Sequence, residues 1–338
     1  MARIGLVLGA GGVVGGAFHA GVLSALEEAT GWDPRTAELI LGTSAGSVSA
    51  ALLRAGFSAA DIAARTAGTP ISAEGAARLR SAGLPPGQAP AVPQPDRSPR
   101  KGSAGPAAPG VLWAAARRPW SVRPPAVLAG LIPEGGLPTT TISEGVDALL
   151  GDSWPAAPLW IAAVRLDDGR LVIFGRDPAP AATPAEAVAA SCAVPGWFTP
   201  VRIRGVRYVD GGAHSLTNVA EVARSGPSPD APDLDLVLVS APMGRTGPGG
   251  LPGAWRRVAR AQLAVEAGVL RRRGVPVVAF QPSVEDQAVM GRDAMDASRR
   301  TAVVQQVRAS TRARLRRPDL AALLAVLTAT RPTATGDA

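Results

Sequence analysis

A serine within the pattern G-x-S-x-G is the first feature of this sequence that could do covalent chemistry. Ser44 lies between Gly42 and Gly46, after the apolar residues 39–41 and before a small-residue segment, residues 47–53. A strand, a tight turn and a helix in this order predict a nucleophile elbow, in which the turn pushes the serine hydroxyl out above the strand end. A Cβ atom at either glycine would collide with the neighbouring strand or helix. The pattern therefore indicates acyl transfer through an acyl-serine.

A glycine-rich segment, residues 9–16, could bind a negative charge. It lies between a predicted strand, residues 3–8, and residues 17–29, which have helical periodicity. Backbone N–H groups in such a turn point together at an anion, either a dinucleotide pyrophosphate or the oxyanion of a tetrahedral intermediate. In the dinucleotide pattern G-x-G-x-x-G, the position of the third glycine is occupied here by Val14. The pattern also requires an acidic residue at the end of a strand about 20 positions later, and the sequence has none there. We favour an oxyanion hole, because the serine turn follows in the next strand–turn–helix unit.

The elements that would position these residues alternate between strand and helix. Further strands are predicted at residues 159–166 and 171–174, joined by the turn signal Asp167-Asp168-Gly169, at a hairpin of residues 201–209, and at residues 234–240 and 275–280. Helices are predicted at residues 142–150, 185–191 and 299–329. This alternation predicts an α/β fold with a mainly parallel central sheet flanked by helices.

The distribution of charge limits the classes of partner. The chain has 338 residues and a formal net charge of +8, and Lys101 is its only lysine, so arginine supplies nearly all the positive charge. Residues 245–317 hold 15 arginines and 5 acidic residues, within a C-terminal part, residues 245–330, that we expect to be mostly helical. No aromatic interleaving or nucleic-acid motif accompanies the arginines, so we expect no nucleic-acid partner. Solvated helix faces are the favoured interpretation, and attraction to anionic lipid is the alternative.

Targeting signals and cysteine content favour a cytoplasmic protein. The N-terminal residues lack the pattern of a signal peptide, and no run reaches the roughly 18 apolar residues of a membrane span. Cys192 is the only cysteine, which excludes an internal disulfide and a cysteine-based metal cluster. Its small apolar surroundings predict a buried, unreactive side chain. We expect no metal ion or other cofactor, and peripheral contact with an anionic membrane at most.

Two segments in the middle of the chain differ from the rest. Residues 81–110 are rich in proline, glycine, alanine, serine and arginine, a composition that cannot fill a core and predicts a flexible insertion. Residues 111–133 place Trp113 and Trp120 among arginines and aliphatic residues. Such a segment could be a lid at a lipid interface, tethered by the insertion, or a cap helix packed on the body of the protein.

Three separated motifs together resemble those of the patatin-like phospholipases. They are Gly9-Ala10-Gly11-Gly12-Val13-Val14-Gly15, Gly42-Thr43-Ser44-Ala45-Gly46 and Asp210-Gly211-Gly212, which resemble the family's oxyanion loop, nucleophile elbow and catalytic aspartate motif. Residues 189–200 look like the segment that leads to this aspartate. The resemblance covers residues 4–219 apart from the proline-rich insertion. It implies a single patatin-like domain, residues 1–338, with a three-layer fold.

The resemblance implies a serine acyl hydrolase that cleaves lipid carboxylic esters, as a phospholipase A, a lysophospholipase or a lipid esterase. Ser44 would be the nucleophile and Asp210 the base of a Ser-Asp dyad. The backbone N–H groups of Gly11, Gly12 and Val13 would hold the oxyanion. The glycines that support the motifs would be Gly9, Gly15, Gly42, Gly46, Gly211 and Gly212. The alternative is a catalytically silent protein of the same fold that binds a lipid or a partner.

The sequence departs from the family pattern at one position and leaves two histidines to assign. Val14 stands where the family's loop usually carries Arg or Lys, so this loop offers no side chain to a phosphate headgroup. Serine, aspartate and histidine in this chain order would also suit the triad of an α/β-hydrolase. His214 follows Asp210 by four residues, and we expect a loop histidine near the base. We expect His19 to be a packing residue.

Overall fold

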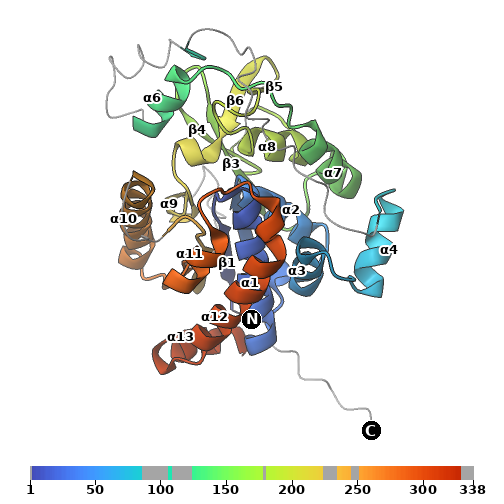
Figure 1. Cartoon of the computed structure of the whole chain (residues 1–338), viewed down its shortest axis with the longest axis vertical. Coiled ribbons are helices and arrows are strands. Elements are labelled where there is room, and N and C mark those ends of the chain that lie inside the picture. Colours follow the sequence, from blue (N-terminus) through green and yellow to red (C-terminus); the bar gives the residue numbers. More distant parts are fainter. Residues whose placement is uncertain are drawn as a thin grey trace.

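A computed structural model of the chain describes residues 2–85, 106–108, 124–177, 180–223, 234–244 and 251–328 (Figure 1). The strands are β1 (Ile4–Leu8), β2 (Leu39–Thr43), β3 (Leu159–Arg165), β4 (Leu171–Phe174), β5 (Val201–Ile203), β6 (Val206–Asp210), β7 (Leu236–Ser240) and β8 (Val277–Phe280). The helices are α1 (Gly12–Thr30), α2 (Ala45–Arg54), α3 (Ala59–Ala67), α4 (Ala73–Ser81), α6 (Pro124–Leu131), α7 (Thr140–Leu150), α8 (Pro184–Ser191), α9 (Ala220–Ala223), α10 (Leu251–Arg272), α11 (Val284–Met290), α12 (Arg300–Leu315) and α13 (Pro318–Thr328).

These strands form one sheet of mixed direction in the order β5-β6-β3-β2-β1-β7-β8, and β4 also pairs with β3. From β3 to β8 all neighbouring strands are parallel. Both β4 and β6 run antiparallel to β3, and β5 runs antiparallel to β6. The predicted α/β fold with a mainly parallel sheet is confirmed, and the antiparallel strands are confined to one end.

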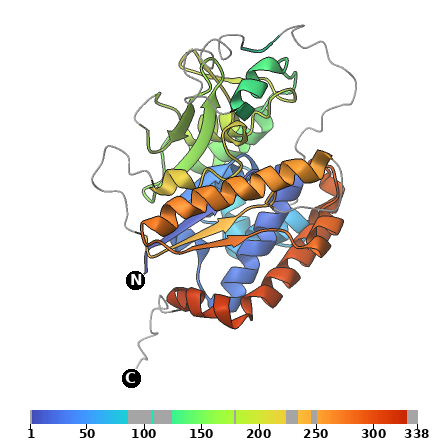
Figure 2. The same ribbon diagram turned by 90° about the vertical axis from the view of Figure 1, so that its left-hand side faces the viewer.

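Helices cover both faces of the sheet and give three layers. Along β1, Leu6 and Leu8 belong to a core shared with α1, α2, α3 and α12, whereas Val7 points into a second core shared with α10. This alternation follows from the two-residue repeat of a strand. Figure 2 shows α10 lying across one face of the strands, with α12 and α13 along the lower right of the view. Helix α12 packs against α1, which covers the other face. The core that contains α1 and α2 is the one that surrounds Ser44.

The helix boundaries differ from the sequence prediction in several places. The helix predicted at residues 299–329 is two helices, α12 and α13, with residues 316–317 between them. Helix α1 begins at Gly12, five residues earlier than expected, because glycine has a low helix propensity and the sequence therefore favours a turn up to residue 16. Helices α3 and α4 were not predicted, because their small and charged residues form only a weak apolar stripe. Their starts nevertheless have a local cause, since the side chains of Ser58 and Ser72 cap them.

The two unusual middle segments are described only in part. Residues 86–105 and 109–110 of the proline-rich segment lie outside the described residues, and so do Trp113 and Trp120 of the expected lid. The described end of that lid segment contains α6, at the end of the molecule that also holds β5 and β6 (Figure 1). Across the ranges given above, no helix combines the length and the apolar character that a bilayer crossing requires.

Candidate active site

Ser44 occupies a strained turn between β2 and α2. Its backbone has φ 54° and ψ −124°, outside the regions that a residue with a Cβ atom prefers, at a cost on the order of 1–3 kcal/mol. The flanking glycines are sterically required. A Cβ atom at Gly42 would lie 2.5 Å from Cα of Ser47, and one at Gly46 would lie 2.0 Å from the carbonyl oxygen of Leu8. The predicted collisions with helix and strand are therefore present.

The conformation of Ser44 is held from the side by α8. This helix begins with a capping box between Thr183 and Glu186 and ends at Ser191. The backbone N–H of Ser44 donates a hydrogen bond of 2.9 Å to Oγ of Ser191. Ser191 could not be recognised from the sequence, because a serine at the end of a small-residue helix carries no pattern of its own.

Asp210 ends β6 and lies level with Ser44 because both strands take their register from β3. Thr43, the residue before Ser44, pairs with Ala162, and Asp210 pairs with Ala163. Only β3 separates the two strands in the sheet. The sheet thus brings together two residues that are far apart in sequence.

The Asp210 carboxylate is buried and its pKa is raised. The residue is 4% exposed, and loss of solvent raises the pKa of its carboxyl group from 3.8 to about 6. Two hydrogen bonds oppose this rise, one from the Ser44 side chain and one of 2.7 Å from the N–H of Gly212. The carboxylate is therefore more basic than an exposed aspartate and contacts the serine hydroxyl.

The glycine loop presents N–H groups that make no hydrogen bond. Gly9 and Ala10 donate to Ser240 and Leu216, and Val14 and Gly15 donate to Ala294 and Gly11. Between these pairs, the N–H groups of Gly11, Gly12 and Val13 have no partner in the described part of the chain. Gly12 has φ 62°, a left-handed conformation that favours glycine. Three adjacent free donors at the start of a helix suit a negatively charged oxygen.

The histidines and the cysteine lie where sequence analysis expected them. His19 is fully buried, and its Nε2 donates to the carbonyl oxygen of Gly9 at 2.8 Å while its Nδ1 accepts from Oγ of Ser240 at 2.8 Å. His214 lies in the loop after β6 and directs its Nδ1 to Oδ1 of Asn218 at 2.9 Å. Cys192 is buried, and burial raises the pKa of its thiol to about 12. Such a thiol is unreactive at neutral pH.

Ser44 lies in the wall of an apolar cavity of about 220 Å³. Gly12, Val13 and Met295 line it close to the glycine loop. Most of the remaining wall is apolar and comes from α2, α3, α7 and the turn between α2 and α3: Val48, Ala51, Leu52, Phe57, Ile62, Ile142, Val146, Leu149 and Leu150. The cavity could hold a hydrocarbon chain beside the serine.

Asn218 is a second site residue that the sequence did not reveal. It has φ 52°, and its side-chain amide donates to Oγ1 of Thr43 at 3.1 Å and to the carbonyl oxygens of Gly211 and Ser215 at 3.3 and 2.7 Å. These bonds join the loop after Asp210 to the residue before Ser44. No short sequence motif predicts a contact between residues that lie 175 positions apart.

Two solved structures are similar to the chain, each at low sequence identity. VipD from Legionella pneumophila is 16% identical, with 92% of this chain and 67% of that chain covered and a TM-score of 0.39. The type III effector protein ExoU is 18% identical, with 94% and 54% covered and a TM-score of 0.32, so the chain spans about half of that protein.

A search of curated protein sequences gives no match. A sequence model of a protein family does match, and it is described as patatin-like phospholipase. The match spans residues 6–223, which is more than half of the chain and includes the glycine loop, Ser44 and Asp210. The chain therefore belongs to the patatin-like phospholipase family.

Proposed function

We propose that the protein is a serine acyl hydrolase of lipid carboxylic esters, with Ser44 and Asp210 as its catalytic dyad. The observation that carries this proposal is a serine on a strained turn whose side chain interacts with a buried, basic carboxylate. Its support is the cavity wall beside it, which is apolar, and the three N–H groups without a partner. Membership of the family agrees with hydrolysis of a lipid ester.

In the first half of the proposed reaction, Oγ of Ser44 attacks the carbonyl carbon of the ester. Its proton passes to the Asp210 carboxylate, which already accepts the hydrogen bond from this hydroxyl. The carbonyl oxygen becomes an oxyanion and is stabilised by the N–H groups of Gly11, Gly12 and Val13, each of which contributes about 3 kcal/mol in comparable sites. The tetrahedral intermediate then collapses, the alcohol leaves with the proton from Asp210, and the acyl group stays on Ser44.

In the second half, water replaces the alcohol. Asp210 accepts a proton from the water as the water oxygen attacks the acyl carbon. The same N–H groups stabilise the second oxyanion. Collapse releases the fatty acid and returns the proton to Ser44, which restores the free enzyme. One carboxylate thus serves as base and acid in turn, and its pKa of about 6 suits both roles near neutral pH.

The cavity supports a fatty acyl chain as the group that is transferred. Most of the residues in its wall between α2, α3 and α7 are apolar. Each methylene group moved there from water contributes about 0.8 kcal/mol of binding free energy. We therefore expect kcat/KM on p-nitrophenyl esters to rise with chain length until the cavity is filled. A parallel panel of phospholipids and neutral glycerides would then define the lipid class.

The test of the proposal is covalent labelling by a fluorophosphonate, which reacts with activated serines. The wild-type protein should be labelled, and Ser44→Ala should lose both labelling and esterase activity. Ser143→Ala, which removes a partly exposed hydroxyl from α7 that does not line the cavity, is the matched control and should keep both. A folded wild-type protein that takes no label would instead favour the silent lipid- or partner-binding alternative.

A peripheral contact with the membrane belongs to the same proposal. The described part of the expected lid would make this contact. Leu128 and Leu131 of α6 are 55% and 40% exposed, and Trp197 is 38% exposed. The chain after α6 lies against the turn that holds Trp197, since Leu137 N–H donates to the Trp197 carbonyl oxygen at 3.1 Å. Exposed large apolar side chains of this kind suit insertion between lipid headgroups.

A further inference from the structure

Two arginines line the cavity that holds Ser44, and neither has a counter-ion. Arg65 lies in the last turn of α3 and is 8% exposed, and Arg300 is the first residue of α12 and is half-buried. Within the described residues, neither guanidinium makes an ion pair or a hydrogen bond, and Nε of Arg65 is fully buried without a partner. A guanidinium is strongly stabilised by a partner when it is removed from water, so this arrangement is costly.

The nearby acidic residue does not neutralise them. Asp61 lines the same cavity and lies one turn before Arg65 on α3. Its carboxylate instead accepts hydrogen bonds from Oγ of Ser58 at 3.0 Å and from the N–H and Oγ of Ser72 at 2.7 and 3.0 Å. Burial lowers the pKa of both arginines, and no acidic group raises it. An arginine nevertheless keeps its proton at neutral pH, so two positive charges remain.

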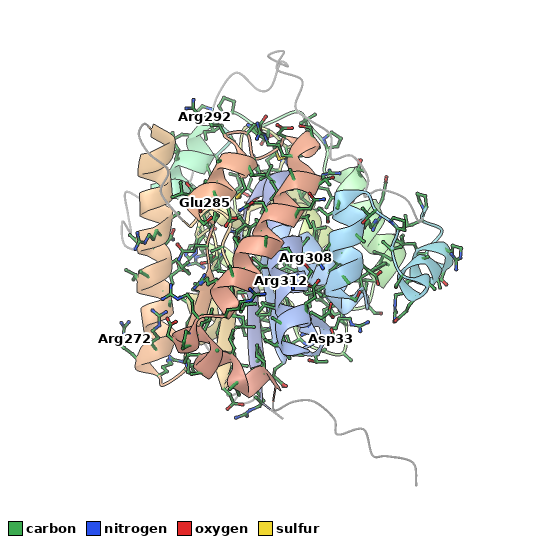
Figure 3. The ribbon with its side chains drawn as sticks, turned by 60° about the horizontal axis from the view of Figure 1, so that its bottom comes forward. Asp33, Arg272, Glu285, Arg292, Arg308 and Arg312 are labelled. Carbon is green, nitrogen blue, oxygen red and sulfur yellow. The ribbon has the colours of Figure 1, made fainter. Side chains whose placement is uncertain are left out.

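Other arginines of α12 show the usual arrangement. Arg308 and Arg312, which Figure 3 labels on this helix, both pair with Glu28 of α1. Arg300 lies on the same helix, yet it faces the cavity and has no such partner. Arg314, the remaining arginine of α12, lies over the ring of Phe280, with 5.0 Å from its Cζ to the ring centroid. Arg300 differs from these three because it faces the cavity.

Local contacts place the two arginines on one wall, next to the glycine loop. Oγ1 of Thr301 donates to the carbonyl oxygen of Ala67 at 2.9 Å, which joins the start of α12 to the end of α3. The segment just before α12 touches the loop, because the Val14 N–H donates to the Ala294 carbonyl oxygen at 2.9 Å. The loop itself, residues 9–16, has no charged side chain. Positive charge near Ser44 therefore comes from α3 and α12.

We propose that Arg65 and Arg300 bind the phosphate group of the lipid substrate, so that the preferred substrates are phosphate-bearing acylglycerols. This inference rests on the proposed function. A phosphate has enough oxygen atoms to accept hydrogen bonds from two guanidinium groups at once, and such charge-assisted bonds are strong. The apolar wall would hold the acyl chain while the arginines hold the headgroup. Arg300 lies outside residues 6–223, so the C-terminal part would set headgroup preference.

The test compares two substrates that differ only in the phosphate. These are 1-decanoylglycerol 3-phosphate and 1-decanoylglycerol, both used as monomers. The ratio of their kcat/KM values should favour the phosphate in the wild-type protein and should fall about tenfold or more in Arg300→Gln and Arg65→Gln. Arg65→Lys should recover part of the ratio. Arg272→Gln removes an exposed charge from the end of α10, away from α12 in Figure 3, and should leave the ratio unchanged.

A ratio that is unchanged in Arg300→Gln would overturn the proposal, and so would a wild-type protein without preference for the phosphate. Arg300 is half-buried, so its variant tests the proposal even if Arg65→Gln fails to fold. Binding to Ser44→Ala, measured by calorimetry, separates this inference from the proposed hydrolysis. Decanoylglycerol phosphate should bind more tightly to Ser44→Ala than to Ser44→Ala/Arg300→Gln. Inorganic phosphate that binds as tightly as the lipid would instead indicate a free-phosphate site and overturn the lipid assignment.

Discussion

The side-chain amide of Asn218 donates a hydrogen bond of 3.1 Å to Oγ1 of Thr43, the residue directly before Ser44. The same amide donates to the carbonyl oxygen of Gly211, the residue directly after Asp210. One side chain thus joins the residue before Ser44 to the residue after Asp210. Asn218 contacts no reacting atom and does not line the cavity. Its role in the proposed reaction is therefore to position Ser44 and Asp210.

We therefore predict that Asn218→Gly lowers kcat roughly tenfold, the cost of about one lost hydrogen bond to a buried group. Glycine is the suitable substitution because residue 218 has φ 52°. Steady-state rates and the rate of fluorophosphonate labelling should fall together, while KM for a short ester should change little. Full activity in Asn218→Gly would show that the hydrogen bonds do not position the dyad.

A second prediction concerns the pH dependence of Asp210. Since the pKa of its carboxyl group is about 6, kcat/KM should rise with pH through about 6 as the base loses its proton, and level off above pH 7. Asp210→Asn cannot accept the serine proton and should lose activity by a factor on the order of 10² or more. His214→Ala should lose little. A loss as deep as that of Ser44→Ala would instead favour a triad.

The same pKa predicts how Asp210 affects stability. The folded-state pKa lies above the ordinary value of 3.8, so the contribution of this group to stability is present below about pH 4 and is lost as pH rises through 6. Asp210→Asn does not titrate, so its free energy of unfolding should rise relative to that of wild type as pH rises from 4 to 7. The expected relative change is up to about 3 kcal/mol. Urea unfolding at both pH values measures this. An equal difference at both would contradict the burial argument.

His19 should change the pH dependence of stability in the opposite direction to Asp210. Burial lowers the pKa of its imidazole from 6.5 to about 4, so its contribution to stability is present above pH 6.5 and is lost as pH falls through 4. His19→Gln keeps a donor for the Gly9 carbonyl oxygen but does not titrate in this range. Its free energy of unfolding should therefore fall less than that of wild type between pH 6.5 and 4. A parallel fall in both proteins would mean that another group controls the acid sensitivity.

The glycine loop gives a further prediction, from the comparison of Gly12 with Val14. A Cβ atom at Gly12 would lie 2.7 Å from the Ala294 carbonyl oxygen, and Gly12 has φ 62°. Gly12→Val should therefore abolish turnover, because it displaces the proposed oxyanion donors. Val14 is buried in the core, so Val14→Ala should lower the melting temperature while kcat changes little. Equal effects on kcat in folded samples would show that the loop does not face the reacting carbonyl.

The sequence could predict the parts of the site that depend on local conformation. Gly42, Ser44 and Gly46 form a pattern because a turn this tight tolerates few residues, and the strand before it is a continuous apolar run. Asp210 could be found only through its motif, since its place beside Ser44 depends on how β2 and β6 each pair with β3. Nothing local distinguishes Arg300 from its neighbours in an arginine-rich helix. Its exposure to the cavity is decided by packing of α12 against α1 and α3.

The last prediction is that the exposed side chains of Leu128, Leu131 and Trp197 bind lipid. Insertion of apolar side chains into a bilayer gains free energy in proportion to the area removed from water, and these three expose more than a third of their surfaces. The double variant Leu128→Ser/Leu131→Ser should therefore bind anionic vesicles more weakly and turn over vesicular substrate more slowly. Val265→Ser is a matched control, because Val265 is 69% exposed on α10 and should not contact the bilayer.

Hydrolysis of a short soluble ester separates binding from chemistry in this experiment. It should be nearly the same in the double variant and in wild type, because neither Leu128 nor Leu131 lies in the cavity wall. Equal losses on soluble and vesicular substrates would show that these side chains support the fold and do not contact lipid. A loss of vesicle binding in Val265→Ser as large as in the double variant would point to α10 as the membrane surface, and the lid interpretation of residues 111–133 would be dropped.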